Sequence, residues 1–169
     1  LLFMTFHNLY NISYTLLGTL VLTNFCTQML VDLIFTMFSK KFNIQKVVRV
    51  MPCITSLGLF VYALIPQFFP QYAYIGLVVG TIIFSVSAGL SEVLLSPVIA
   101  AIPSDNPQKD MSMLHSLYGW GVVTNVIIAS LFFLIFGTEN WMFLTLFLAT
   151  IPFIASFLFL PFWISSRKR

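Results

Sequence analysis

Charged residues are scarce in this sequence of 169 residues. Lys and Arg number 8 and Asp and Glu number 5, so that 8% of the chain is charged, against about 25% in an ordinary soluble domain. So few charges cannot cover the surface of a soluble fold of this size. The net charge of +3 does not indicate nucleic-acid binding, because the basic residues occur in short runs at the ends of apolar segments.

Cysteine is also rare, and Cys26 and Cys53 are the two in the chain. Both lie inside apolar segments, which argues against a disulfide framework and predicts two small buried hydrophobic residues. The sequence motifs of zinc proteases, of the nucleophile elbow of hydrolases and of the P-loop do not occur. A metal site normally needs three protein ligands, and the two histidines, His7 and His115, are expected on opposite sides of a membrane. No cofactor or metal is indicated, and we expect the protein not to be an enzyme.

Long apolar runs fill most of the chain, since 59% of the residues are hydrophobic and 19 are Phe. A membrane-spanning helix needs about 20 apolar residues, and the alternating segments of a β-barrel are not found. The predicted fold class is an all-α, polytopic membrane bundle in one domain. The five predicted spans are about 12–38, 47–66, 73–101, 113–137 and 141–164. Residues 1–6 are interpreted as the end of a sixth helix, so the chain is expected to be a fragment.

The basic residues all lie on one side of the membrane that these spans predict. They are Lys40, Lys41, Lys46, Arg49, Lys109, Arg167, Lys168 and Arg169. The opposite loops contain no Lys or Arg. Because Lys and Arg collect on the cytoplasmic side of membrane proteins, the basic loops and the C-terminal end are predicted to be cytoplasmic in a multi-pass protein of the plasma membrane.

Polar residues recur at helical spacing in three of the five spans. A step of four residues advances only about 40° around a helix, so residues at this spacing share one face. The three polar faces consist of Asn24, Gln28 and Asp32; of Ser85, Gly89, Glu92 and Ser96; and of His115, Tyr118 and Asn125. The other two spans, 47–66 and 141–164, are expected to be peripheral and to face lipid.

Glu92 is the first candidate for a functional residue. A carboxylate inside a membrane is costly unless it is protonated, paired or facing water, and such residues mark proton relays and substrate paths. The alternative is a structural carboxylate that is hydrogen-bonded to a neighbouring helix. Asp32 and His115 are further candidates for proton coupling or substrate binding. The alternative for Asp32 is an ion pair with a loop Lys, and the alternative for His115 is a packing role. The candidate substrate-binding residues are Asn24, Gln28, Tyr118 and Asn125.

Several stretches resemble the N-terminal half of a transporter of the major facilitator superfamily. Segments within residues 1–32 are similar to the end of helix one and to helix two, and residues 39–46 occupy the basic loop that follows. Residues 88–92 and 114–121 resemble helices four and five of the fucose and sugar-permease branch. The loop departs from the family pattern at Thr36, Lys40, Asn43 and Ile44. The Gly-Pro signature of antiporters is missing, which favours symport or uniport.

The resemblance implies a bundle in which helices one and four line a central cavity, two and five flank it, and three and six face lipid. It implies secondary-active transport of a small polar solute, such as a sugar, by alternating access and with proton coupling through Glu92. It also implies that the missing C-terminal half of the same protein is a partner, besides the solute and the lipid bilayer. Two other classes stay open: the substrate-binding membrane subunit of a vitamin uptake complex, and a membrane-embedded enzyme.

Overall fold

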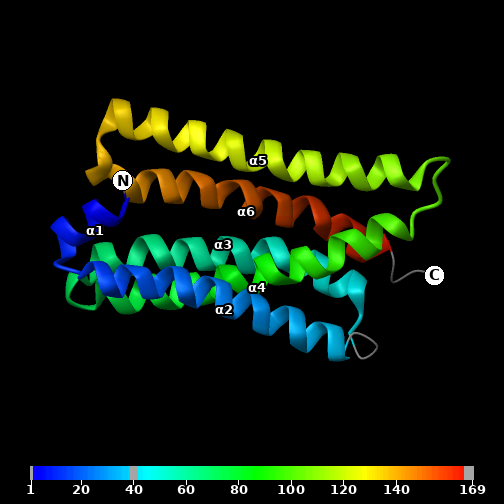
Figure 1. Cartoon of the computed structure of the whole chain (residues 1–169), viewed down its shortest axis with the longest axis horizontal. Helices are drawn as coiled ribbons and strands as arrows, with labels where there is room; N and C mark the ends of the chain where they lie inside the picture. Colours follow the sequence, from blue (N-terminus) through cyan, green and yellow to red (C-terminus); the bar gives the residue numbers. More distant parts are fainter. Residues whose placement is uncertain (1, 39–41, 166–169) are drawn as a thin grey trace.

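The computed structural model describes residues 2–38 and 42–165, which form a bundle of helices (Figure 1). No β-strand occurs within these ranges. The helices are α1 (Leu2–Tyr10), α2 (Tyr14–Phe38), α3 (Ile44–Phe68), the 3-10 helix η2 (Pro70–Tyr72), α4 (Ala73–Ala100), α5 (Pro107–Phe136), the 3-10 helix η3 (Thr138–Asn140) and α6 (Trp141–Ser165). The predicted all-α fold class is therefore confirmed.

Five described helices, α2 to α6, are long and apolar enough to cross a membrane. Their ends agree with the predicted spans within three residues, except that α5 begins at Pro107 rather than at about 113. Asn106 explains the earlier start, because its side-chain Oδ1 accepts a hydrogen bond from the Lys109 backbone N–H at 3.1 Å. Pro107 occupies the first turn, where its missing N–H costs no helical hydrogen bond. The five helices are compatible with a multi-pass membrane protein.

The segment interpreted as the end of a helix is α1, which continues to Tyr10. It stops at Asn11, whose φ of 52° is in the left-handed region. The His7 Nδ1–H donates a hydrogen bond to the backbone oxygen of Ile12 at 2.9 Å, and the His7 ring stacks on Tyr14 with centroids 4.5 Å apart. These contacts fix the turn between α1 and α2.

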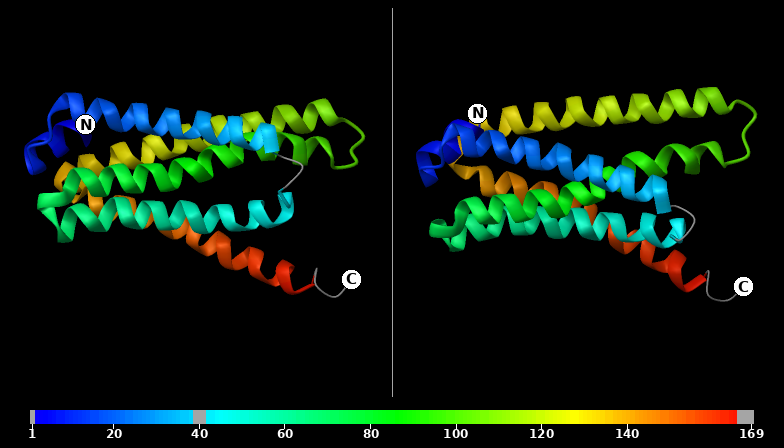
Figure 2. Two further views of the ribbon diagram at one scale, coloured as in Figure 1. Left: turned by 90° about the horizontal axis from the view of Figure 1, so that it is seen from below. Right: turned by 60° about the horizontal axis from the view of Figure 1, so that its bottom comes forward.

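One end of the bundle has a continuous apolar core in which α1, α2, α4 and α6 meet (Figure 2). Its buried residues are Phe6, Ile12, Leu17, Leu20, Ala73, Leu77 and Trp141. The rings of Phe6 and Trp141 pack edge to face with centroids 4.8 Å apart, a favoured aromatic geometry. A second cluster, of Phe35, Met51 and Leu94, lies nearer the other end.

Helix α3 packs against both α4 and α6 (Figure 1). The Ser87 hydroxyl donates a hydrogen bond to the Met51 backbone oxygen at 2.8 Å, and the Ser56 hydroxyl donates one to the Ala149 backbone oxygen at 3.1 Å. The span expected at 47–66 thus packs along two neighbouring helices, while its Val50 and Leu57 side chains stay exposed. Small residues and buried hydroxyls, rather than a polar stripe, mark a packed helix in a membrane.

Helix α5 lies at the edge of the bundle, and none of its residues is buried. At Gly119 and Gly121 an added Cβ would meet no atom within 4 Å. Cys26 and Cys53 are also exposed, on α2 and α3, so the expectation that they are buried is wrong. An apolar side chain gains little by moving from lipid into protein, because lipid tails are equally apolar.

Candidate functional site

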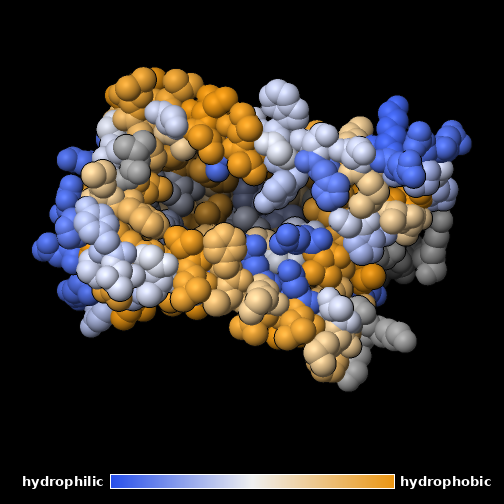
Figure 3. Space-filling model, in the orientation of Figure 1, coloured by the Kyte–Doolittle hydropathy of each residue, from blue (hydrophilic) through white to orange (hydrophobic). Residues whose placement is uncertain are grey.

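A cavity of about 460 Å³ lies between α2, α4 and α5. Figure 3 shows the surface hollowed beneath α5, with hydrophilic side chains beside the hollow. Its polar lining residues are Gln28 on α2, Ser91, Glu92 and Ser96 on α4, and His115 and Tyr118 on α5. The three spans with a predicted polar face thus meet at one cavity, and four of the seven candidate site residues line it.

The polar lining groups lie at a similar depth in the bundle. Glu92 is eight residues before the end of α4 at Ala100, and His115 is eight residues after the start of α5 at Pro107. At 1.5 Å per residue, each is about 12 Å from its helix end. Gln28 is ten residues before the end of α2, or about 15 Å. The cavity is therefore about 12–15 Å from the ends of these three helices.

Glu92 and His115 are both exposed to this cavity. Within residues 2–38 and 42–165, neither side chain has a hydrogen-bond or ion-pair partner. The structure thus gives no interhelical hydrogen bond that would make Glu92 a structural carboxylate. Glu92 is the carboxyl group in this lining. No described Lys or Arg lines the cavity to neutralise a negative charge on it.

Asn24 does not line the cavity but lies one helical turn from Gln28 on α2. Its side-chain Oδ1 accepts a hydrogen bond from Gln28 Nε2 at 2.9 Å and a second from the Ser85 hydroxyl at 2.6 Å. Ser85 is fully buried on α4. These two bonds connect the cavity wall on α2 to α4.

Asp32 and Asn125 stand apart from this cavity. Asp32 is half-buried near the end of α2, and its Oδ1 is buried without a hydrogen-bond partner in the described part of the chain. Lys40 and Lys41, its predicted partners, lie outside the described residues. Asn125 is exposed ten residues beyond His115 on α5. Neither residue therefore contributes to the cavity wall.

The described basic residues lie at one end of the bundle, where α3 and α5 begin (Figure 1). They are Lys46, Arg49 and Lys109. The other five, Lys40, Lys41, Arg167, Lys168 and Arg169, lie outside the described residues. The cavity is nearer to this basic end than to the end that contains α1.

Several lining residues could not be selected by polar spacing. Ser91 precedes Glu92 but lies about 100° away from it around the helix, outside the predicted stripe. The apolar lining residues are Ala88, Leu95, Leu114 and Leu117. In a sequence made mostly of apolar helices, such residues give no signal that separates a cavity wall from a lipid-facing surface.

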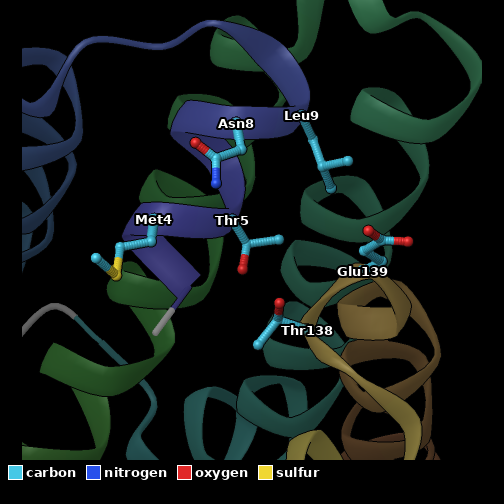
Figure 4. A pocket seen from close by; sticks show the side chains of 6 residues that line it. All are labelled: Met4, Thr5, Asn8, Leu9, Thr138 and Glu139. Carbon is cyan, nitrogen blue, oxygen red and sulfur yellow. The ribbon is translucent and has the colours of Figure 1, made fainter.

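A smaller recess of about 190 Å³ lies between α1 and η3, near the end opposite the basic residues (Figure 4). It is lined by Met4, Thr5, Asn8, Leu9, Thr138 and Glu139. Glu139 lies at its edge in the close view. None of the predicted site residues is among them, and the recess lies outside the α2, α4 and α5 cavity.

Among the described residues, no three His, Cys, Asp or Glu side chains lie close enough together to hold a metal ion. No family model, curated protein or solved structure that was compared with this chain matches it. The resemblance to the major facilitator superfamily therefore stays a hypothesis that rests on the sequence.

Proposed function

We propose that this chain is part of a secondary-active transporter that moves a small polar solute, such as a sugar, across the plasma membrane. The observation that supports this most is the meeting of polar residues from α2, α4 and α5 at one cavity, at similar distances from the helix ends. Polar groups inside a membrane are costly unless they face water, a substrate or one another. A solute cavity gives Gln28, Glu92, His115 and Tyr118 such surroundings.

Glu92 is proposed as the proton-coupling group. It lines the cavity without a partner among the described side chains, so that it is accessible to both a proton and a solute. A carboxyl group binds one proton reversibly. If the solute binds better to the protonated protein than to the deprotonated one, or the reverse, the movement of the solute is coupled to that of the proton. His115 in the same wall can hydrogen-bond to the solute or to Glu92.

The opposite wall of the cavity is proposed to come from the C-terminal half of the same protein, as in the major facilitator superfamily. Helix α5 supports this, because it has no buried residue and places Asn125 and Tyr118 on its exposed surface. A second bundle that rocks against this one would give alternating access. The basic end is proposed to face the cytoplasm, following the distribution of Lys and Arg.

Uptake into proteoliposomes tests this proposal. The full-length protein is reconstituted and offered a panel of labelled sugars, polyols and amines, with and without a pH gradient. We expect saturable uptake of at least one solute that the gradient accelerates. Tight binding of a solute without flux would instead favour the substrate-binding subunit of an uptake complex.

A further inference from the structure

We propose that Ser85 is a positioning residue of the cavity, which acts through Asn24 to turn the Gln28 amide so that its Oε1 faces the solute. The cavity would then receive a hydrogen-bond donor of the solute, a hydroxyl or an ammonium group. This inference rests on the proposed function, because it describes how the same cavity selects what it binds.

The hydrogen bonds of Asn24 determine this orientation. Its Oδ1 accepts from Ser85 Oγ–H at 2.6 Å and from Gln28 Nε2–H at 2.9 Å. A carbonyl oxygen has two lone pairs, so both are occupied. One N–H of Gln28 Nε2 binds Asn24, so the amide presents Oε1 to the cavity beside its second N–H, and Oε1 has no partner within the described part of the chain.

Ser85 fixes which way round these amides lie. In the reverse arrangement Asn24 would donate from Nδ2 to Gln28 Oε1, and Gln28 would present Nε2 to the solute. The Ser85 hydroxyl has 0% exposure and donates to Asn24 Oδ1. In the reverse arrangement it could only accept from Asn24 Nδ2, and its buried O–H would lose this acceptor, so the first arrangement is favoured. Gly89, one turn further along α4, keeps α2 close, since a Cβ there would lie 3.1 Å from the Gln28 backbone oxygen.

The hydrogen-bond acceptors in the cavity wall are consistent with a preference for a solute that donates hydrogen bonds. Glu92 adds a carboxylate to the Gln28 oxygen, and none of the described Lys and Arg residues lines the cavity. A solute group placed at these two oxygens is disfavoured if it is anionic, whereas a hydroxyl or ammonium group can donate to them. The chemistry shared by the favoured solutes is therefore a hydrogen-bond donor at this position.

Ser87 provides a matched control for Ser85. It is also buried on α4, with 1% exposure, and its hydroxyl also bonds to another helix. Its partners, however, are on α3: it donates to the Met51 backbone oxygen at 2.8 Å and accepts from the Thr55 hydroxyl at 2.7 Å, and it does not line the cavity. Ser85→Ala and Ser87→Ala each remove one buried interhelical hydroxyl, but only Ser85→Ala releases Asn24.

The first experiment measures the side-chain amide of Gln28 directly. The full-length protein is labelled with 15N-glutamine, placed in nanodiscs and studied by NMR, and the Gln28 signals are assigned by their loss in Gln28→Leu. Ser85→Ala removes the hydrogen bond that holds Asn24 Oδ1 toward Gln28, worth about 1 kcal/mol, so the Gln28–Asn24 bond should open more often and amide-proton exchange at Gln28 should accelerate by up to about fivefold. Ser87→Ala should leave it unchanged, and Asn24→Asp, which keeps the acceptor oxygen, should stay close to the wild type. Equal exchange rates in the two serine variants would overturn the positioning role.

The second experiment uses sorbitol, glucamine and gluconate, which share a carbon chain and end in a hydroxymethyl, an ammonium and a carboxylate group. All three carry hydroxyl groups, so the comparison is of the concentration at which each shifts the Gln28 amide signal. We expect sorbitol or glucamine to shift it at a lower concentration than gluconate; the more effective of the two identifies a hydroxyl or an ammonium group as the preferred donor. A shift by gluconate at the same or a lower concentration, as the reverse amide orientation predicts, or by none of the three, would overturn the donor preference.

Both measurements are made at equilibrium and do not require flux. A protein that shows the Ser85 effect but moves no solute in liposomes would refute the proposed transport function alone. A protein that transports solute but shows no Ser85 effect would refute this inference alone.

Discussion

Gly80 is the position at which the packing of α3 against α4 can be tested most sharply. A Cβ at Gly80 would lie 2.6 Å from Cα, Cβ and N of Tyr62. Carbon atoms pack at about 3.5–4.0 Å, so in Gly80→Ala the two helix backbones must separate by about 1 Å. Overpacking of this kind costs about 1–3 kcal/mol. Gly80→Ala should therefore lower the free energy of unfolding by that amount.

Gly119 is the matched control on α5, where an added Cβ meets no atom within 4 Å. Gly119→Ala should be neutral or stabilising by up to about 1 kcal/mol, since Ala favours helix more than Gly does. Unfolding of the two variants in mixed micelles of increasing SDS content, followed by tryptophan fluorescence, to which the buried Trp141 contributes, measures the difference. Equal stability of Gly80→Ala and Gly119→Ala would refute the close approach of α3 and α4.

The remaining predictions concern topology, Asp32 and completeness. In a protein with Cys26 and Cys53 replaced by Ser, Gln71→Cys should react with an impermeant thiol reagent in intact cells and Gln108→Cys should not. The reason is that the basic end is proposed to face the cytoplasm. The reverse labelling would invert the orientation. Asp32→Asn should raise the unfolding free energy by about 1 kcal/mol, because a buried carboxylate oxygen without a partner among the described residues costs more than a neutral amide. Solute affinity should not change. A lower melting temperature of Asp32→Asn would show that Asp32 has a stabilising partner. The 169-residue chain alone should catalyse no solute flux in liposomes, and flux by this chain would contradict the need for a second bundle.

The membrane spans could be predicted from the sequence because length and apolarity alone decide whether a helix can cross a bilayer. Helical spacing also selected Gln28, Glu92, His115 and Tyr118, which the structure brings to one cavity. Spacing places residues on a face but does not say which helix that face meets.

The packing between helices is what the sequence could not supply. The packing of α3 on α4 and α6 includes hydroxyls that bond across helices, such as Ser56 to α6. Similar hydroxyls elsewhere bond within their own helix, as Thr150 does. Helical spacing places Ser85 on the polar face of α4 and Ser87 on another face, but it does not say that the first face meets α2 and the second meets α3. The crossing geometry of the helices decides that.

Proton-driven accumulation in Glu92→Gln tests the central claim most directly. One carboxyl group lines the cavity, which predicts one proton per solute, and one pH unit is equivalent to about 1.4 kcal/mol, or a tenfold accumulation. In proteoliposomes of the full-length protein with a gradient of one pH unit, the wild type should accumulate its solute up to about tenfold. Glu92→Gln keeps the shape but cannot bind the proton, so it should equilibrate the solute without accumulation and retain solute exchange. Undiminished accumulation by Glu92→Gln would contradict the account.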